Sequence, residues 1–329
     1  MSIDRFLARA ADTTVLVVGD VMVDAYLWGR VDRISPEAPV PVVQVTHRSA
    51  RLGGAANVAL NVRALGGKAI IATVVGEDDN ADLLTKLFAE QELVPDGLVR
   101  SPFRRTTVKT RVISGHQHVV RVDEEQEDDL ATTDEDLLLE RVALILRNDP
   151  PGVIVLEDYN KGVLTARVIE GIIDLAKQAK VPVAVDPKKK NFLAYRGVDL
   201  FKPNLKELRE GLKTEVDPAD AASVQRAVRL LEEKLGNRLS MVTLSEHGAY
   251  IHGANDEHRA PAHARKIVDV SGAGDTVIAV AALALAQGHT PRVVVELANL
   301  AGGLVCEEVG VAPINKERFR SECERLGLA

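Results

Sequence analysis

The sequence predicts an α/β protein built on a buried, mostly parallel β-sheet. Short apolar runs rich in valine and isoleucine alternate with longer segments of helical periodicity, which is typical of successive βα units. No repeat, low-complexity tract or glycine- and serine-rich linker divides the chain. We therefore expect the 329 residues to form a single domain, 1–329.

The expected strands and helices follow one another in a regular order. The strands cover 15–18, 69–75, 153–156, 181–185, 200–202 and 240–244. Helices are expected at 54–65, 80–91, 165–179, 221–235, 277–286 and 293–305, where helix formers and apolar residues recur at helical spacing. The alternation of the two sets is the observation that predicts parallel strands.

Two segments, 24–47 and 103–123, interrupt this order. Both alternate polar and apolar residues around turn signals such as Ser114-Gly115, so we expect half-exposed antiparallel strands outside the main sheet. A small β-flap over the strand ends would act as a lid that excludes water during a reaction. An edge hairpin without a gating role is the alternative.

Polar side chains follow the expected strands at their carboxyl ends. The residues in these positions are Asp20, Asp158, Asp186, Asn204 and Glu246. Ligands of open α/β sheets bind at this edge, so the recurrence favours a binding site there. Each residue could alternatively cap the helix that follows it.

Composition and charge exclude several classes of function. The net charge is −7 and aromatic residues make up 3% of the chain, so no nucleic-acid surface is expected. Two cysteines without C-x-x-C spacing predict neither a disulfide framework nor a metal site, and they suit a reducing cytosol. The N-terminal segment does not resemble a secretory signal, and no apolar run could span a bilayer. We therefore expect a cytoplasmic protein without membrane contact.

The segment 269–276 (DVSGAGDT) is the most informative, because it leads into the apolar helix expected at 277–286. Gly272, Ala273 and Gly274 would form the helix entry, where free backbone N–H groups and the helix dipole attract an anion. Asp275 is placed to take a proton from a hydroxyl group. An anion hole beside a base is what a kinase acting on alcohols requires. Alternatively, Asp275 only stabilises the first turn of an ordinary helix.

A second glycine-rich segment, 51–57 (RLGGAAN), opens the helix expected at 54–65. Gly53 and Gly54 allow close approach of a ligand, and Asn57 offers a donor and an acceptor to a polyol. A dinucleotide-binding fold is disfavoured because the first strand runs into GDVMVD (19–24), which lacks G-x-G-x-x-G. No P-loop motif, G-x-x-x-x-G-K-[ST], occurs either.

Taken together, GGAAN at 53–57 and D-x-x-G-A-G-D at 269–275 resemble the two signatures of the ribokinase (phosphofructokinase-B type) sugar kinases. The segment 202–207 (KPNLKE) is similar to that family's Asn-x-x-Glu element. The resemblance runs from about Thr14 to about Pro313. It implies a ribokinase-like three-layer α/β/α fold with a β-flap lid, the use of ATP and Mg²⁺, and a homodimer formed through the lid.

A closer resemblance, to the kinases of D-glycero-D-manno-heptose 7-phosphate, rests on 19–24 (GDVMVD), 33–41 (RISPEAPVP), 105–111 (RTTVKTR) and 158–162 (DYNKG). It implies ATP-dependent phosphorylation of D-glycero-β-D-manno-heptose 7-phosphate at O1. The product would be the 1,7-bisphosphate, in ADP-heptose and lipopolysaccharide inner-core biosynthesis. Many such kinases carry a C-terminal cytidylyltransferase-like domain. Because this sequence stops at Ala329, we expect adenylylation to need a separate adenylyltransferase.

The resemblance also implies roles for individual residues. Asp275 would be the base that deprotonates the anomeric hydroxyl, beside a γ-phosphate site formed by the glycine-rich helix entry. Asn204 and Glu207 would orient Mg²⁺ through water, although their spacing also fits a helix capping box. Further nucleotide contacts are expected at Leu205, Lys206, Ser245, Glu246, Gly248 and Asn299.

On the sugar side, Asp20 is expected to accept sugar hydroxyls, because a carboxylate accepts more than one hydrogen bond. Gly53, Gly54 and Asn57 are expected to bind the sugar with it. The substrate's own phosphate needs cations near the cleft. The candidates, each of which could instead be a solvated surface charge, are Arg105, Lys109, Lys161, Lys188 and Lys189.

Other functions stay open at this point. A kinase for another sugar, sugar phosphate or nucleoside would use the same chemistry. A sugar-phosphate-binding protein without turnover is disfavoured by the intact Asp275, and a nicotinamide oxidoreductase by the missing dinucleotide motif. A monovalent cation could also bind in the loop after Asp269, as it does in some relatives.

Overall fold

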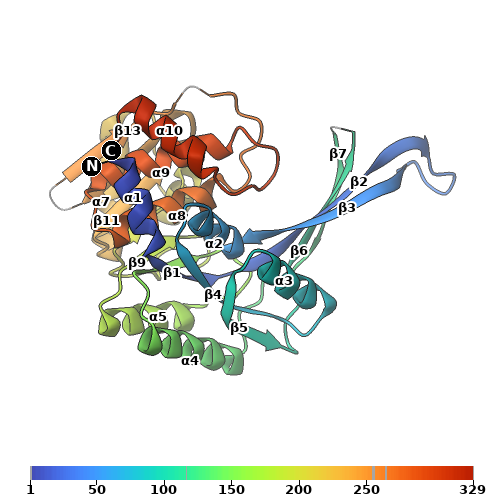
Figure 1. Ribbon diagram of the computed structural model, residues 1–329, viewed down its shortest axis with the longest axis horizontal. Helices are drawn as coiled ribbons and strands as arrows, with labels where there is room; N and C mark the ends of the chain where they lie inside the picture. Colours follow the sequence, from blue (N-terminus) through green and yellow to red (C-terminus); the bar gives the residue numbers. More distant parts are fainter. Residues whose placement is uncertain (1, 116, 254–255, 264, 329) are drawn as a thin grey trace.

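The computed structural model describes residues 2–115, 117–253, 256–263 and 265–328. Its main sheet has nine strands in the order β13-β12-β11-β10-β9-β8-β1-β4-β5 (Figure 1). The strands from β11 to β5 in this order run parallel, whereas β12 and β13 pair antiparallel at one edge. The predicted α/β fold with a mostly parallel sheet is confirmed.

The main-sheet strands are β1 (Thr14–Gly19), β4 (Lys68–Gly76), β5 (Val94–Ser101), β8 (Val153–Glu157), β9 (Val183–Asp186), β10 (Leu200–Phe201), β11 (Leu239–Thr243), β12 (Ala249–Gly253) and β13 (Asp256–Ala260). One face is covered by α1 (Ile3–Ala11), α2 (Ala55–Ala64), α3 (Asp79–Glu90), α8 (Ala273–Ala286), α9 (Pro291–Val305) and α10 (Lys316–Leu326). The other is covered by α4 (Thr132–Asn148), α5 (Ala166–Ala179), α6 (Leu205–Leu212) and α7 (Ala221–Leu235).

Alternation along the strands divides the core between these two layers. In β1, Val15 and Val17 pack toward α8, whereas Leu16 and Val18 pack toward α4 and α5. Helix α8 lies against the sheet and is buried from residue 275 to residue 285. The carboxyl ends of β9 and β10 lie next to the first turn of α8, because a Cβ on Gly274 would lie 3.5 Å from Asp186 Oδ2 and 3.7 Å from Lys202 Nζ.

Most elements expected from apolar patterns are present, with boundaries shifted by a few residues. The strand expected at 181–185 begins at Val183, because Val181 still closes the end of α5 by donating its N–H to Ala176. The expectation missed β5, the helices α1, α4 and α10, and the antiparallel pair β12 and β13. In the last pair, charged residues such as Asp256 and Glu257 weaken the apolar signal.

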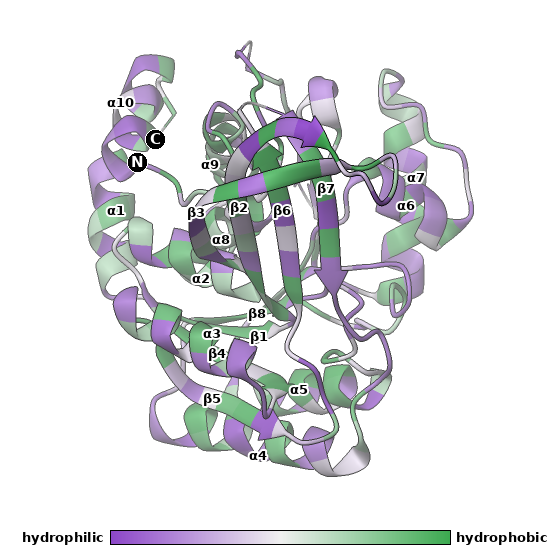
Figure 2. Cartoon of the chain, turned by 90° about the vertical axis from the view of Figure 1, so that its right-hand side faces the viewer, coloured by the Kyte–Doolittle hydropathy of each residue, from purple (hydrophilic) through white to green (hydrophobic). Residues whose placement is uncertain are grey.

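A second sheet, the lid sheet, consists of β2 (Val21–Ile34), β3 (Pro41–Gly54), β6 (Val108–Ser114) and β7 (Gln117–Glu124). Its order is β3-β2-β6-β7, and it projects from the body (Figure 1); Figure 2 shows hydrophilic and hydrophobic residues along its strands. The expectation of purely antiparallel strands is wrong, because β2 and β6 pair in parallel. The strand β3 also continues to Gly54, so the glycine pair ends a strand and does not follow a loop.

Apolar side chains are exposed on the lid sheet and on the turn between β2 and β3. They are Ile34, Val40, Val45, Val120 and Val122. Among the described residues, no helix has the length and apolar character needed to cross a membrane.

Candidate active site

Asp275 lies in the first turn of α8, and donors from two other elements hold its carboxylate. Asn57 of α2 donates from Nδ2 to Asp275 Oδ2 at 2.7 Å, and the hydroxyl of Tyr159, after β8, donates to Oδ1 at 2.7 Å. Burial is the main cause that raises the pKa of Asp275, and these two hydrogen bonds oppose the rise. The arrangement holds a carboxylate of enhanced basicity in a fixed orientation, as a general base requires.

Among the described residues no side chain caps the first-turn N–H groups of α8, although the N–H of Ala273 donates to the carbonyl of Val270 at 3.3 Å. Gly272, the N-cap residue, has a φ of +77°, and a Cβ there would lie 2.8 Å from Asn57 Nδ2. Both the backbone conformation and the close approach of Asn57 require glycine. Ala273 and Gly274 follow as the first helical residues. Uncapped N–H groups at a helix start can bind an anion beside Asp275.

Charged side chains from neighbouring strand ends lie beside this helix start. Glu157 ends β8 and pairs in register with Asp186, which ends β9. Lys202 follows β10, and its Nζ lies 2.6 Å from Asp186 Oδ2. All three side chains are buried. Asp186, one of the polar strand ends expected from the sequence, thus lies next to α8 together with Lys202, and Glu157 is its register partner.

Asn204 and Glu207 form a reciprocal capping box at the start of α6. The N–H of Glu207 donates to Asn204 Oδ1, and the N–H of Asn204 donates to Glu207 Oε2, both at 2.8 Å. Glu207 Oε1 accepts from Lys188 Nζ at 2.6 Å. The capping alternative is therefore present, and it leaves Asn204 Nδ2 and further lone pairs for other contacts. Leu205 and Lys206 follow in the same turn, with the Lys206 side chain 83% exposed.

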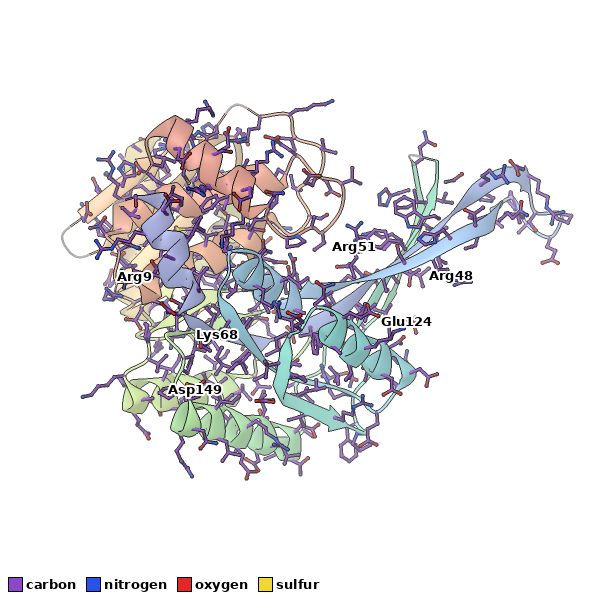
Figure 3. The ribbon with its side chains drawn as sticks, viewed as in Figure 1. Arg9, Arg48, Arg51, Lys68, Glu124 and Asp149 are labelled. Carbon is purple, nitrogen blue, oxygen red and sulfur yellow. The ribbon has the colours of Figure 1, made fainter. Side chains whose placement is uncertain are left out.

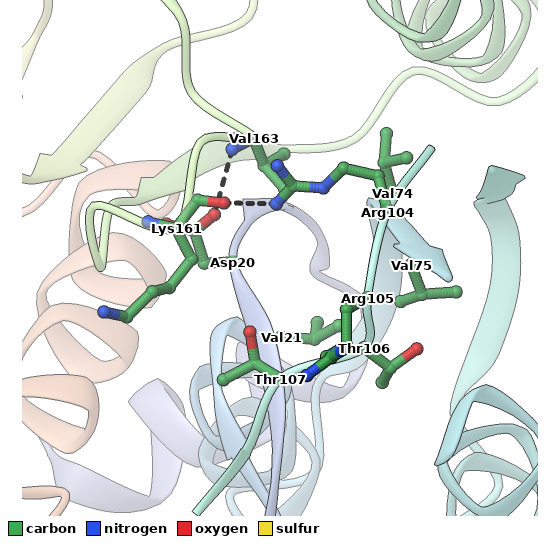
Figure 4. A pocket seen from close by; sticks show the side chains of 10 residues that line it. All are labelled: Asp20, Val21, Val74, Val75, Arg104, Arg105, Thr106, Thr107, Lys161 and Val163. Atoms are coloured by element: carbon green, nitrogen blue, oxygen red, sulfur yellow. Dashed lines mark hydrogen bonds between the residues drawn. The ribbon is translucent and has the colours of Figure 1, made fainter. Parts of the chain in front are cut away.

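Asp20 is buried after β1, where its carboxylate orders the loop that follows β8. Oδ2 accepts the N–H groups of Tyr159 and Lys161 at 2.8 and 3.0 Å, and Oδ1 accepts that of Val163 at 3.1 Å. Figure 4 shows this carboxylate beside the loop, with Arg104 next to it. The hydrogen bonds use the oxygen atoms that the sequence analysis assigned to sugar hydroxyls. In this structure Asp20 anchors the loop that carries Tyr159.

The candidate cations for a substrate phosphate fall into two groups. Lys188 forms an ion pair with Glu207, and Lys189 Nζ lies 3.7 Å from Glu210 Oε2. Because Glu207 and Glu210 are residues of α6, both lysines lie on the α6 side of the site. The other group lies where the lid sheet joins the body and consists of Arg105, Lys109 and Lys161.

Within the lid-side group, carboxylates of the segment after β7 neutralise the lysines. Lys109 Nζ lies 2.6 Å from Glu125, and Lys161 Nζ lies 2.9 Å from Glu125 and 2.6 Å from Glu127. The guanidinium of Arg105 makes no hydrogen bond or ion pair with any residue that the structure describes. Arg105 is therefore the candidate whose charge is most available.

The base of the lid sheet contributes residues that the sequence analysis did not assign. Arg111 of β6 donates to the buried Asp24 of β2, and Asp24 Oδ2 lies against Gly53. Arg51 of β3, labelled in Figure 3, donates to the carbonyl of Val311 at 2.9 Å. The lid sheet is thus tied to the loop after α9. The motifs 19–24 and 105–111 contained Asp24 and Arg111, but nothing in the sequence showed that they pair.

The residues expected near the nucleotide lie at two places. Ser245 and Glu246 lie in a short 3₁₀ helix, Ser245–His247, which follows β11 and has Gly248 as its C-cap; Glu246 is exposed. Asn299 of α9 donates to the carbonyl of Pro261 at 2.9 Å, so it fixes the segment that leads toward α8. Gly248 also borders this segment, since a Cβ there would lie 2.0 Å from the carbonyl oxygen of Ala260.

A helix start without a side-chain cap, a buried carboxylate beside it and polar residues at the strand ends suit a kinase that acts on sugar hydroxyls. Residues 12–318 match the model of the "pfkB family carbohydrate kinase", and the chain belongs to this family. The predicted ribokinase-like fold and the assignment as a sugar kinase are confirmed.

Curated relatives and solved structures agree with this family. The chain is 40% identical over 97% of its length to the bifunctional protein HldE of Granulibacter bethesdensis and 46% identical over 92% to that of Caulobacter vibrioides. It spans 66% and 62% of their lengths. Escherichia coli phosphofructokinase-2 with potassium superposes with a TM-score of 0.79 at 19% identity, over 96% and 99% of the two chains. Arabidopsis thaliana ribokinase with ribose and ATP gives 0.72 at 18%, over 94% and 98%.

Proposed function

We propose that the chain phosphorylates D-glycero-β-D-manno-heptose 7-phosphate at O1 with ATP, giving the 1,7-bisphosphate for ADP-heptose and lipopolysaccharide inner-core biosynthesis. The observation that carries the proposal is the buried Asp275, held by Asn57 and Tyr159 beside an uncapped helix start. The similarity to HldE proteins over most of this chain supports the choice of acceptor.

In the proposed reaction, Asp275 takes the proton from the C1 hydroxyl of the sugar while the oxygen of that hydroxyl attacks the γ-phosphorus of ATP. The bond between that phosphorus and the β,γ-bridging oxygen breaks, and ADP leaves. The N–H groups at the start of α8 stabilise the charge on the transferred phosphoryl group. Asn57 and Tyr159 keep the carboxylate oriented throughout. Most of the catalysis is therefore positioning and electrostatic stabilisation.

The donor set on the α6 side suits Mg²⁺, which prefers oxygen ligands and retains several waters. Asn204 and Glu207 would hold the ion through water, and the ion would offset charge on the nucleotide phosphates. Among the described residues there is no group of three or more acidic, histidine or cysteine side chains that could chelate it directly. This fits a hydrated ion shared with phosphate oxygens. We also assign a monovalent cation to the loop after Asp269, and the potassium complex of Escherichia coli phosphofructokinase-2 supports this assignment.

The phosphate of the acceptor is assigned to the lid-side cations. Arg105 has an available charge, and Lys161 lies on the loop that Asp20 anchors next to Tyr159. An acceptor bound there would have its phosphate at the lid and its C1 end at Asp275. The other assigned residues, Lys188 and Lys189, would instead act on the nucleotide side. Exposed apolar residues such as Val120 and Val122 support a homodimer formed through the lid sheet.

ADP release with Mg·ATP and a panel of acceptors tests the proposal. The panel contains heptose 7-phosphate, free heptose, fructose 6-phosphate, ribose and adenosine. We expect selective turnover of heptose 7-phosphate. Turnover of another acceptor would retain the kinase and overturn the acceptor assignment. Absence of turnover with all of them, with ATP still bound, would favour a sugar-phosphate-binding protein.

A further inference from the structure

The side chains of Glu157, Asp186 and Lys202 form a row on one face of the sheet. Glu157 and Asp186 are register partners, and the N–H of Lys202 donates to the carbonyl of Val185 on the neighbouring strand. The residues two positions before each of them, such as Val155 and Leu200, pack in the core layer that contains α8. Because side chains alternate along a strand, the row faces the same layer.

Lys202 is an unusual member of this row because its ammonium group is buried. Its side chain is 3% exposed, and Nζ lies 2.6 Å from Asp186 Oδ2. Burying a lysine is rare and costly, and the ion pair with the equally buried carboxylate of Asp186 offsets part of that cost.

Glu157 shows that the row does more than contain one ion pair. It is fully buried, and neither of its carboxylate oxygens has a hydrogen-bond partner among the described residues. Burial, followed by the charges of Asp186 and Asp275, raises its pKa well above the usual range. The burial of Glu157 beside Asp186 thus favours its protonated form, which would repel an anion less than a carboxylate would.

Gly274, in the first turn of α8, is the helix residue that faces the row at close range. A Cβ at this position would lie 3.5 Å from Asp186 Oδ2 and 3.7 Å from Lys202 Nζ. The helix start and the lysine thus face each other across roughly one van der Waals contact. An anion held by the N–H groups of α8 would be within reach of Lys202.

We propose that Lys202 is a catalytic residue that contacts the phosphoryl group in transfer from the sheet side, facing the N–H groups of α8. The proposal rests on the kinase function proposed above. Lysine is a natural partner for phosphate oxygens, and a charge placed before the reaction needs no reorganisation in the transition state. Asp186 holds Nζ in position when no nucleotide is bound. The buried amine thereby supplies charge stabilisation in addition to the helix start.

Nucleotide binding provides a test that needs no acceptor. Isothermal titration calorimetry of the full chain, in the presence of Mg²⁺, compares the affinity for a non-hydrolysable ATP analogue with the affinity for ADP. Only the analogue has a γ-phosphate. For Lys202→Met, we expect the preference for the analogue over ADP to fall at least tenfold. With the accepted substrate, kcat should fall at least 100-fold while the KM of the acceptor changes little. Lys202→Arg should recover part of both losses.

Lys86→Met, which removes an exposed lysine of α3, is the matched control and should behave like the wild type. If Lys202→Met retains both kcat and the preference for the analogue, and only its melting temperature falls, Lys202 is a structural residue and the proposal is wrong. If Lys202→Met does not fold, the paired change Lys202→Gln with Asp186→Asn removes both charges and is judged by the same binding ratio. A wild type without turnover would overturn the proposed function but leave this binding test intact.

Discussion

The hydroxyl of Tyr159 lies 2.7 Å from Asp275 Oδ1 and links the loop after β8 to the first turn of α8. Burial, followed by the charge of Asp275, raises the pKa of Tyr159 well above 10. The hydroxyl therefore stays protonated and acts only as a donor to the carboxylate. The carboxylate of Asp20 accepts hydrogen bonds from backbone N–H groups of the same loop. The orientation of the base therefore depends on β1, β8 and α8 together.

Asp275→Asn should remove the base while conserving the size of the side chain. We expect kcat to fall by about 10²- to 10⁴-fold, as for loss of a general base, with nucleotide affinity nearly unchanged. Steady-state kinetics and nucleotide titration check this. Full activity in the variant would show that another group accepts the proton.

Tyr159→Phe should change the pH dependence of the reaction. The hydrogen bond from Tyr159 lowers the pKa of Asp275, so its loss should raise that pKa further. Because the base acts only when ionised, the acidic limb of kcat should move to higher pH, with the variant approaching wild-type activity at alkaline pH. A pH–rate profile measures the shift. A uniform loss of kcat at every pH would mean that the hydroxyl has only a structural role.

Arg105→Gln should weaken binding of a phosphorylated acceptor specifically. Loss of the available cation removes a charge-assisted contact, so we expect KM for heptose 7-phosphate to rise about 10-fold or more, with little change for ATP. Arg100→Gln, an exposed arginine that pairs with Asp82 on α3, is the control. An unchanged KM in Arg105→Gln would move the phosphate site elsewhere, with Lys188 and Lys189 as the next candidates.

Asp158 should make stability depend on pH. Burial, followed by the charge of Asp20, raises its pKa to about 6, although the hydroxyl of Tyr195 donates to it at 2.8 Å. The folded state thus binds this proton more tightly than the unfolded state, whose carboxyl keeps a pKa near 3.8. The contribution of Asp158 to the free energy of unfolding therefore falls, by up to about 3 kcal/mol, as the pH rises from about 4 to about 6.

Asp158→Asn removes that dependence. Urea unfolding at pH 4.5 and 7.5 should show the variant gaining stability relative to the wild type at the higher pH. Asp149→Asn, at the end of α4, should show no such gain. Parallel pH curves for Asp158→Asn and the wild type would contradict the assignment.

Local sequence signals predicted the parts of the fold and site that are local in the chain. The apolar runs indicated β1, β4, β8 and β11, and the glycine-rich segments indicated the starts of α2 and α8. The structure brings Asn57 and Asp275, one from each segment, into direct contact. The sequence could not reveal that contact, because the two residues are far apart along the chain.

Tertiary pairing explains what the sequence did not predict. The charges of Lys109 and Lys161 are neutralised by ion pairs with Glu125, and no local sequence pattern connects these three residues. The parallel pairing of β2 with β6 depends on register between distant segments and contradicts the antiparallel expectation. Lys202 belonged to a quoted motif, but its burial beside Asp186 becomes visible only when β9 and β10 are neighbours.

Phosphate transfer to O1 of heptose 7-phosphate is tested most directly by ³¹P NMR of the product formed with Mg·ATP. We predict a sugar with two phosphorus signals, one of them coupled to the anomeric proton, and no such product with Asp275→Asn. A new phosphate on another carbon would contradict transfer to O1, and equal product formation by Asp275→Asn would contradict the role of Asp275 as the base.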